Sequence, residues 1–117
     1  MFDTRPIVVG KPDCLLPVDV RVDEGTAVGP DRLVNTVAGH DLYGGDLIIF
    51  DFGTATTFDA INEDGSYEGG IIAPGINLSL ESLHQAAAQL PRIAVSRPDR
   101  VIAKSTVPAM QSGIYWG

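Results

Sequence analysis

The stretch DLIIFDFGTATTFDA, residues 46–60, decides the fold of this chain. Its apolar run from Leu47 to Phe50 has the length of a buried strand, yet it leads straight into a carboxylate at Asp51. Gly53 then predicts a turn, and the alternating, threonine-rich residues 54–61 predict a second strand. The stretch therefore indicates two strands joined by a short turn, with an unexplained acid at the end of the first.

The residues that follow extend this sheet. NEDG, residues 62–65, is a tight-turn sequence, because Asp-Gly suits a hairpin. SYEGGIIAPG, residues 66–75, predicts a third strand that Pro74 and Gly75 close. Three strands with short turns predict an antiparallel β-meander, so the fold class is α/β once the flanking helices are included.

Helical patterns flank the sheet on both sides. Residues 29–45 predict a helix, with Pro30 at its first position and with Gly39, then Gly44 and Gly45, stopping it. Residues 77–91 predict the clearest helix, ended by Pro91, and a further helix begins at TVPAMQSGIYWG. RPIVVG and part of RPDRVIAKST are read as short strands, and VDVRV as a short extended piece.

Composition narrows the function classes. The chain has 117 residues, 44% of them hydrophobic, and a formal net charge of −7. Such acidity argues against a nucleic-acid surface, and no apolar run approaches the ~20 residues of a membrane span. No signal peptide is visible, and the lone Cys14 is read as a reduced thiol without chemistry. Lys and Arg are absent between Arg32 and Arg92, where eight acids predict a solvated surface or a cation site.

The residues Asp51-Phe52-Gly53-Thr54 are the first candidate site. Glycine permits close backbone approach to a ligand, and the next amide and the Thr54 hydroxyl are donors suited to phosphate oxygens. A carboxylate at the strand end is suited to a cation that offsets phosphate charge. The alternative is a hairpin in which Asp51 bonds its own turn. No P-loop, dinucleotide-binding glycine motif or zinc motif accompanies it.

The second candidate is Gly29-Pro30-Asp31-Arg32, where an acid and a base meet at a helix start. The positive end of the helix dipole favours Asp31 there. The alternative is an ordinary acid in the first turn of a helix.

Together these stretches resemble the type III pantothenate kinases. The segments VGPDRLVNTVAGH, residues 46–91 and VIAKSTVPAMQSGIYWG follow the middle of that family in order and spacing. The resemblance implies a two-lobed, ribonuclease-H-like fold of the actin and sugar-kinase (ASKHA) superfamily. Residues 1–45 would end the first lobe and carry the substrate motif, and residues 46–117 would begin the second, truncated lobe.

The resemblance also implies an activity and its residues. The reaction is ATP-dependent phosphorylation of pantothenate to 4′-phosphopantothenate, the first step towards coenzyme A, by a cytoplasmic homodimer. The pantothenate motif falls on Gly29, Pro30, Asp31 and Arg32, with Asp31 as general base and Pro30 in place of the usual alanine. Thr106 matches another pantothenate contact, Gly53 and Thr54 match the ATP site, and Asp51 matches the site of a monovalent cation, K⁺ or NH₄⁺. Mg²⁺ is expected on the nucleotide.

The departures from the family pattern are large. The family's N-terminal Asp-x-Gly-Asn-Thr phosphate loop does not occur in this sequence, and neither does its Thr-Gly-Gly stretch. The sequence is therefore expected to be the central part of the enzyme and inactive by itself. The alternative is a non-catalytic interaction or regulatory remnant of the same family, acting through a protein rather than through DNA.

Overall fold

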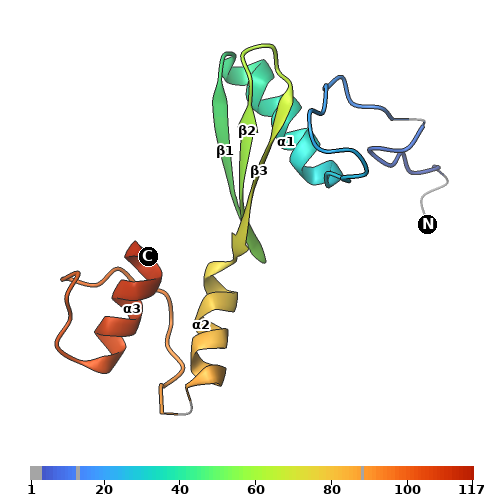
Figure 1. Ribbon diagram of the computed structural model, residues 1–117. Helices are drawn as coiled ribbons and strands as arrows, with labels where there is room; N and C mark the ends of the chain where they lie inside the picture. The colour runs from blue at the N-terminus through green and yellow to red at the C-terminus, as the bar shows by residue number, and fades with distance from the viewer. Residues whose placement is uncertain (1–3, 13, 88) are drawn as a thin grey trace. The chain divides into compact units, whose positions relative to one another are not determined.

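The computed structural model describes residues 4–12, 14–87 and 89–117. Its strands are β1 (Leu47–Phe52), β2 (Ala55–Ile61) and β3 (Tyr67–Pro74), and its helices are α1 (Pro30–Tyr43), α2 (Ile76–Ala86) and α3 (Thr106–Trp116) (Figure 1). The strands pair in the order β1-β2-β3, which confirms the antiparallel meander. By its contacts the chain divides into two compact units: Met1–Phe50 with Thr57–Ile71 form unit 1, and Asp51–Thr56 with Ile72–Gly117 form unit 2.

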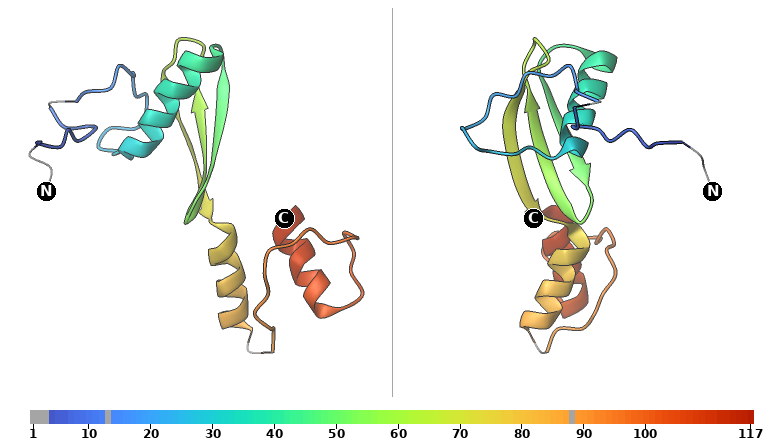
Figure 2. Two further views of the ribbon diagram at one scale, coloured as in Figure 1. Left: turned by 180° about the vertical axis from the view of Figure 1, so that it is seen from behind. Right: turned by 90° about the vertical axis from the view of Figure 1, so that its right-hand side faces the viewer.

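In unit 1, α1 lies along one face of the sheet (Figures 1 and 2). Pro30 occupies the first turn, as predicted, and Gly44, with φ of 64°, ends the helix. The prediction that Gly39 stops the helix is wrong, because Gly39 lies inside it. A Cβ on Gly39 would lie 2.7 Å from Cδ1 of Ile49, so this glycine serves the close packing of α1 on β1.

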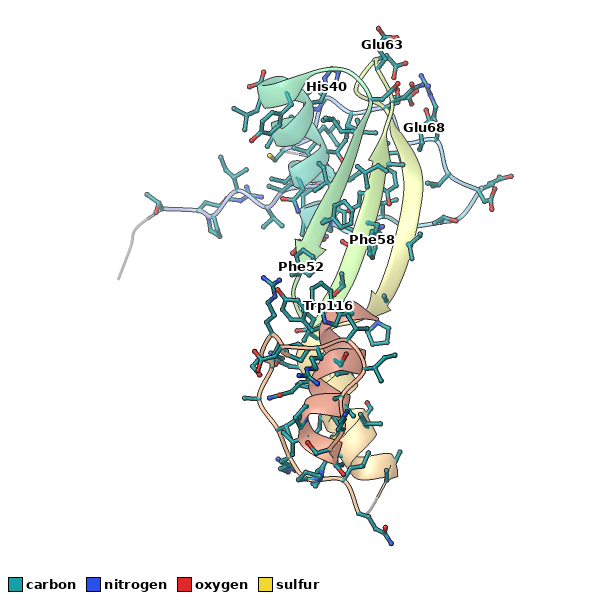
Figure 3. All side chains as sticks on the ribbon, turned by 90° about the vertical axis from the view of Figure 1, so that its left-hand side faces the viewer. His40, Phe52, Phe58, Glu63, Glu68 and Trp116 are labelled. Carbon is teal, nitrogen blue, oxygen red and sulfur yellow. The ribbon has the colours of Figure 1, made fainter. Side chains whose placement is uncertain are left out.

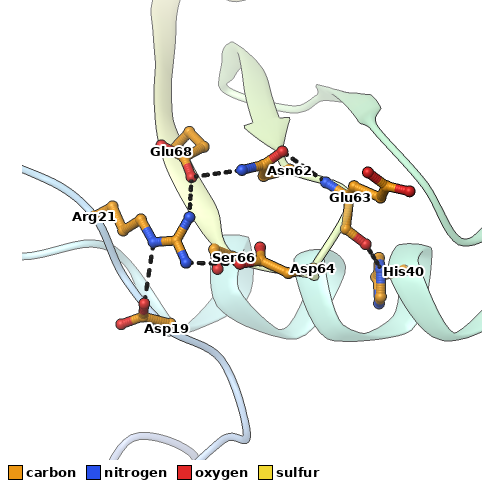
Figure 4. A network of polar contacts seen from close by, with 8 residues as sticks. All are labelled: Asp19, Arg21, His40, Asn62, Glu63, Asp64, Ser66 and Glu68. Atoms are coloured by element: carbon orange, nitrogen blue, oxygen red, sulfur yellow. Dashed lines mark hydrogen bonds and ion pairs between the residues drawn. The ribbon is translucent and has the colours of Figure 1, made fainter.

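The hairpin between β2 and β3 anchors the N-terminal segment of unit 1. Gly65 supplies the positive φ that the turn needs, at 82°. Val20 then forms a parallel bridge with Tyr67, so VDVRV is extended as predicted. Arg21 pairs with three acids, Asp19, Asp64 and Glu68 (Figure 4). RPIVVG, residues 5–10, is described throughout and forms no strand, so that prediction is wrong.

In unit 2, α2 and α3 contact each other, and Leu80 of α2 and Met110 of α3 are buried. The helix α2 ends at Ala86, five residues before the Pro91 that was predicted to stop it. Among the described residues from 89 to 105 there is no strand, which corrects the short strand expected in RPDRVIAKST. Residues 89–105 are therefore irregular.

Several large apolar side chains stay exposed. Alternate residues of β1 point to one face, so Leu47 and Ile49 are half-buried while Ile48, Phe50 and Phe52 are exposed. The rings of Phe50 and Phe58 meet edge to face, with their centroids 4.7 Å apart. Phe58 lies on β2 and Phe52 on β1 (Figure 3). No helix among the described residues is long and apolar enough to cross a membrane.

Candidate functional site

The candidate residues fall into two groups, one in each unit. Gly29, Pro30, Asp31 and Arg32 belong to unit 1, where they form the start of α1. The other candidates, Asp51, Gly53, Thr54 and Thr106, belong to unit 2.

Asp31 presents an exposed carboxylate at the positive end of α1. Gly29 is the N-cap and gives the helix no side-chain cap. A Cβ on Gly29 would lie 2.5 Å from Oδ1 of Asp31, so only glycine lets this carboxylate fold back over the helix start. An exposed acid in a defined position is suited to accept a proton from a bound hydroxyl group.

Arg32, the next residue, turns the opposite way, into the protein. Its Nε donates to Oδ1 of Asp59 at 2.8 Å, and its Nη2 donates to the same oxygen. The hydrogen bonds from Arg32 to Asp59 raise the pKa of the guanidinium above its usual value, against the lowering effect of burial. The side chain of Arg32 is 15% exposed, more than that of its buried partner Asp59.

Asp59 is one of the eight acids between Arg32 and Arg92 that predict a solvated surface or a cation site. The solvated surface is wrong for Asp59, and the sequence did not single it out as a site residue. Its side chain is fully buried. Besides Arg32, the hydroxyl of Tyr67 donates to Oδ1 at 2.9 Å, and the hydroxyl of Thr57 approaches Oδ2 at 3.5 Å. Burial, and then the hydrogen bond to Asp59, raise the pKa of Tyr67 to about 12. A signal was present: Thr57, Asp59 and Ile61 alternate onto one face of β2, and Ile61 is buried.

In unit 2, the Gly53–Thr54 turn sits directly against the start of α2. The amide of Gly75, the N-cap of α2, donates to the carbonyl of Thr54 at 3.1 Å. A Cβ on Gly75 would lie 2.3 Å from that oxygen and 2.5 Å from the carbonyl oxygen of Gly53. The first turn of α2 carries no acid and no side-chain cap, so its positive end beside the turn is not neutralised.

Gly53 itself is not required by packing. A Cβ there would meet nothing closer than the carbonyl oxygen of Ala55 at 3.6 Å. Gly53 and Thr54 are both exposed, and the amide of Gly53 donates to the carbonyl of Ala55 at 2.9 Å. The outer surface of the turn is therefore open to close approach by a ligand.

Asp51 is half-buried, one residue before the end of β1. Among the described residues no group of three or more His, Cys, Asp or Glu side chains could hold a metal ion. A multi-carboxylate cage for a divalent ion is thus not formed by the part of the chain that the structure describes.

Thr106 is the first residue of α3 and is exposed. Its neighbour Ser105 lines a cavity of about 290 Å³ together with three cations, Arg97, Arg100 and Lys104, and one acid, Asp99. The positive end of α3 adds to the same field. This part of unit 2 is suited to an anionic group, although the chain as a whole is acidic.

Comparison with known proteins decides the family. The model of the family described as "Type III pantothenate kinase" matches residues 1–117. The chain belongs to the type III pantothenate kinase family. Proteins named type III pantothenate kinase are 72% identical to it in Roseobacter denitrificans, 70% in Ruegeria sp. strain TM1040 and 67% in Dinoroseobacter shibae, each over 116 residues. Each match covers 99% of this family member and 45% of the relative, so the chain spans about half the length of the curated relatives it matches.

Proposed function

We propose that this chain carries the pantothenate motif and one phosphate-binding turn of an enzyme that phosphorylates pantothenate with ATP. The observation that carries the proposal is the start of α1, where an exposed Asp31 precedes an Arg32 held by a buried acid. That pairing offers a base for a hydroxyl group and a cation for an anionic substrate at adjacent positions. Membership of the kinase family supports the same activity.

Each candidate residue has a role in this reaction. The hydroxyl oxygen of pantothenate attacks the γ-phosphorus of ATP, and Asp31 accepts the proton of that hydroxyl. ADP leaves with the electrons of the broken P–O bond. Gly53 and Thr54 hold phosphate oxygens, helped by the positive end of α2. Gly29 and Pro30 set the path of the chain before Asp31. Thr106, beside the basic cavity, contacts pantothenate, which is itself a carboxylate.

Cations complete the proposed site. We propose that Asp51 holds a monovalent cation, K⁺ or NH₄⁺, and that Mg²⁺ accompanies the nucleotide. The charge that these ions supply offsets the negative charge of the triphosphate. The ribonuclease-H-like, two-lobed fold, the homodimer and the cytoplasmic location are likewise proposals that rest on the family resemblance, and so is the division into residues 1–45 and 46–117.

The test uses a hybrid enzyme, in which the 116 matched residues of this chain replace the corresponding stretch of the Roseobacter denitrificans relative. We expect ATP-dependent formation of phosphopantothenate by the hybrid, with a rate that rises on adding K⁺ or NH₄⁺. A soluble, folded hybrid with no turnover would contradict the proposal. Full activity without any monovalent cation would contradict the role of Asp51 alone.

The isolated 117-residue chain is expected to show no turnover, because the family's first phosphate loop does not occur in it. Calorimetric titration of the folded chain with pantothenate and with ATP separates this case from the alternative of a non-catalytic remnant. Binding of either compound favours the kinase site. If neither compound binds, the result favours an interaction or regulatory role.

A further inference from the structure

The buried contact between Arg32 and Asp59 has a geometry that a plain structural ion pair does not need. Nε and Nη2 of Arg32 both face Oδ1 of Asp59, so one edge of the guanidinium is taken. Within the described residues no hydrogen bond engages Nη1, at the other edge. The side chain of Asp59 is 0% exposed and that of Arg32 is 15% exposed, so Arg32 is the more accessible member of the pair.

Further residues hold the guanidinium in this orientation. The hydroxyl of Tyr67 donates to the same Oδ1 at 2.9 Å, and the Tyr67 ring centroid lies 5.6 Å from Cζ of Arg32. Gly70 lies close against the pair and against β2, because a Cβ there would lie 2.2 Å from the carbonyl oxygen of Phe58, 2.5 Å from Nη2 of Arg32 and 2.8 Å from Oδ1 of Asp59.

The backbone of β3 is irregular between Tyr67 and Gly70. Gly69 has φ of 126°, which lies outside the range of a regular strand. The strand thus departs from regular geometry beside the residues that lie close to Asp59 and Arg32.

We propose that Asp59 is a positioning residue for substrate: it fixes Arg32 so that the free Nη1 edge is presented to pantothenate before binding. The inference rests on the proposed function. A guanidinium that is already oriented loses little side-chain entropy when it binds, and its remaining donors keep their direction. Asp59 acts only through Arg32, since its own oxygens are buried.

The test uses the hybrid enzyme and compares Asp59→Asn with Asp64→Asn. Asp64 is the matched control, because it also pairs with an arginine of unit 1, Arg21, but on the exposed surface. We expect Asp59→Asn to raise KM for pantothenate about 10- to 100-fold, the loss typical of a hydrogen bond to a charged group, with KM for ATP nearly unchanged. Asp64→Asn is expected to leave both constants unchanged.

A second variant keeps the test decisive if Asp59→Asn does not fold. Tyr67→Phe removes one hydrogen bond from Oδ1 and leaves the ion pair. It is expected to raise KM for pantothenate by less than Asp59→Asn does. Melting curves of each variant report the structural role separately.

The outcomes distinguish the inference from the proposed function. An unmutated hybrid without turnover would remove both. An active hybrid in which the foldable variants keep the KM for pantothenate, or raise the KM values for ATP and pantothenate equally, would overturn the positioning role of Asp59 alone.

Discussion

The amide of Gly75 donates to the carbonyl oxygen of Thr54 across 3.1 Å, which locks the turn after β1 to the start of α2. The contact is so close that a Cβ on Gly75 would lie 2.3 Å from that oxygen. The phosphate-binding role proposed for this turn requires that its donors keep their direction, and this contact restrains the turn.

Replacing Gly75 with alanine tests the lock. The added methyl group has to displace backbone atoms of Gly53 and Thr54, so we expect the free energy of unfolding to fall by about 1–3 kcal/mol, the usual cost of overpacking. In the hybrid enzyme the distorted turn should also raise KM for ATP. Urea denaturation followed by circular dichroism measures the first effect, and steady-state kinetics the second. An unchanged unfolding curve would contradict the close contact between Gly75 and Thr54.

Replacing Gly53 with alanine separates ligand binding from packing. Its Cβ would meet nothing closer than 3.6 Å, so stability should change by no more than about 0.5 kcal/mol. A methyl group on the open surface of the turn should nevertheless obstruct phosphate and raise KM for ATP, by roughly tenfold if one hydrogen bond is lost. Equal KM values for Gly53→Ala and the unmutated hybrid would mean that ATP does not approach this turn.

Asp31→Asn tests the general base. The carboxamide has nearly the same shape but cannot take up the substrate proton, so kcat of the hybrid should fall by about 10²- to 10⁴-fold. Because Asp31 is exposed, the circular dichroism spectrum and the melting temperature should change little. Asp41→Asn is the control, since Asp41 is an exposed acid near the other end of α1. Turnover at the unmutated rate in Asp31→Asn would exclude the residue as base.

Asp64 predicts a pH dependence of stability. The hydrogen bonds from Ser66 and then from Arg21 lower the pKa of Asp64 from 3.8 to about 2. A carboxyl group whose pKa is lowered by folding stabilises the protein above its unfolded pKa, and this contribution is lost as pH falls through the folded value. The melting temperature of Asp64→Asn should therefore lie below that of the unmutated chain near neutral pH. The gap should narrow between pH 3.8 and about 2, and a gap that stays constant over that range would refute the assignment.

Substitutions at two helical glycines are expected to change the free energy of unfolding differently. Gly113 lies within α3 with nothing near its Cβ position, so Gly113→Ala should raise the free energy of unfolding by about 1 kcal/mol through helix propensity. Gly39→Ala should gain less, because Cδ1 of Ile49 must move aside, and Gly39→Leu should lose about 1–3 kcal/mol. Chemical denaturation measures all three. A stabilising Gly39→Leu would mean that α1 does not pack closely on β1.

The local sequence pattern was sufficient to predict the three strands of the sheet and the starts of two helices. The apolar run from Leu47, the alternation in β2 and the Asp-Gly turn each depend on neighbours in sequence, and the structure confirms all three strands. Pro30 and Pro108 likewise lie in the first turns of α1 and α3, where a missing amide proton costs nothing. Gly39 shows the limit, because helix propensity alone cannot tell a stop from a glycine that packs against a neighbouring strand.

The candidate residues divide in the same way. Asp31, Arg32, Asp51 and the Gly53–Thr54 turn were found from the sequence, since each belongs to a short motif whose order carries the family resemblance. Asp59 was grouped with the solvated acids, because along the chain it is one more carboxylate in a long interval without Lys or Arg. The pairing of β2 with β3 and the packing of α1 buried it and brought it against Arg32, 27 residues away. A carboxylate's charge partner at that separation depends on long-range packing, so only the tertiary structure decided that Arg32 is held by a buried acid.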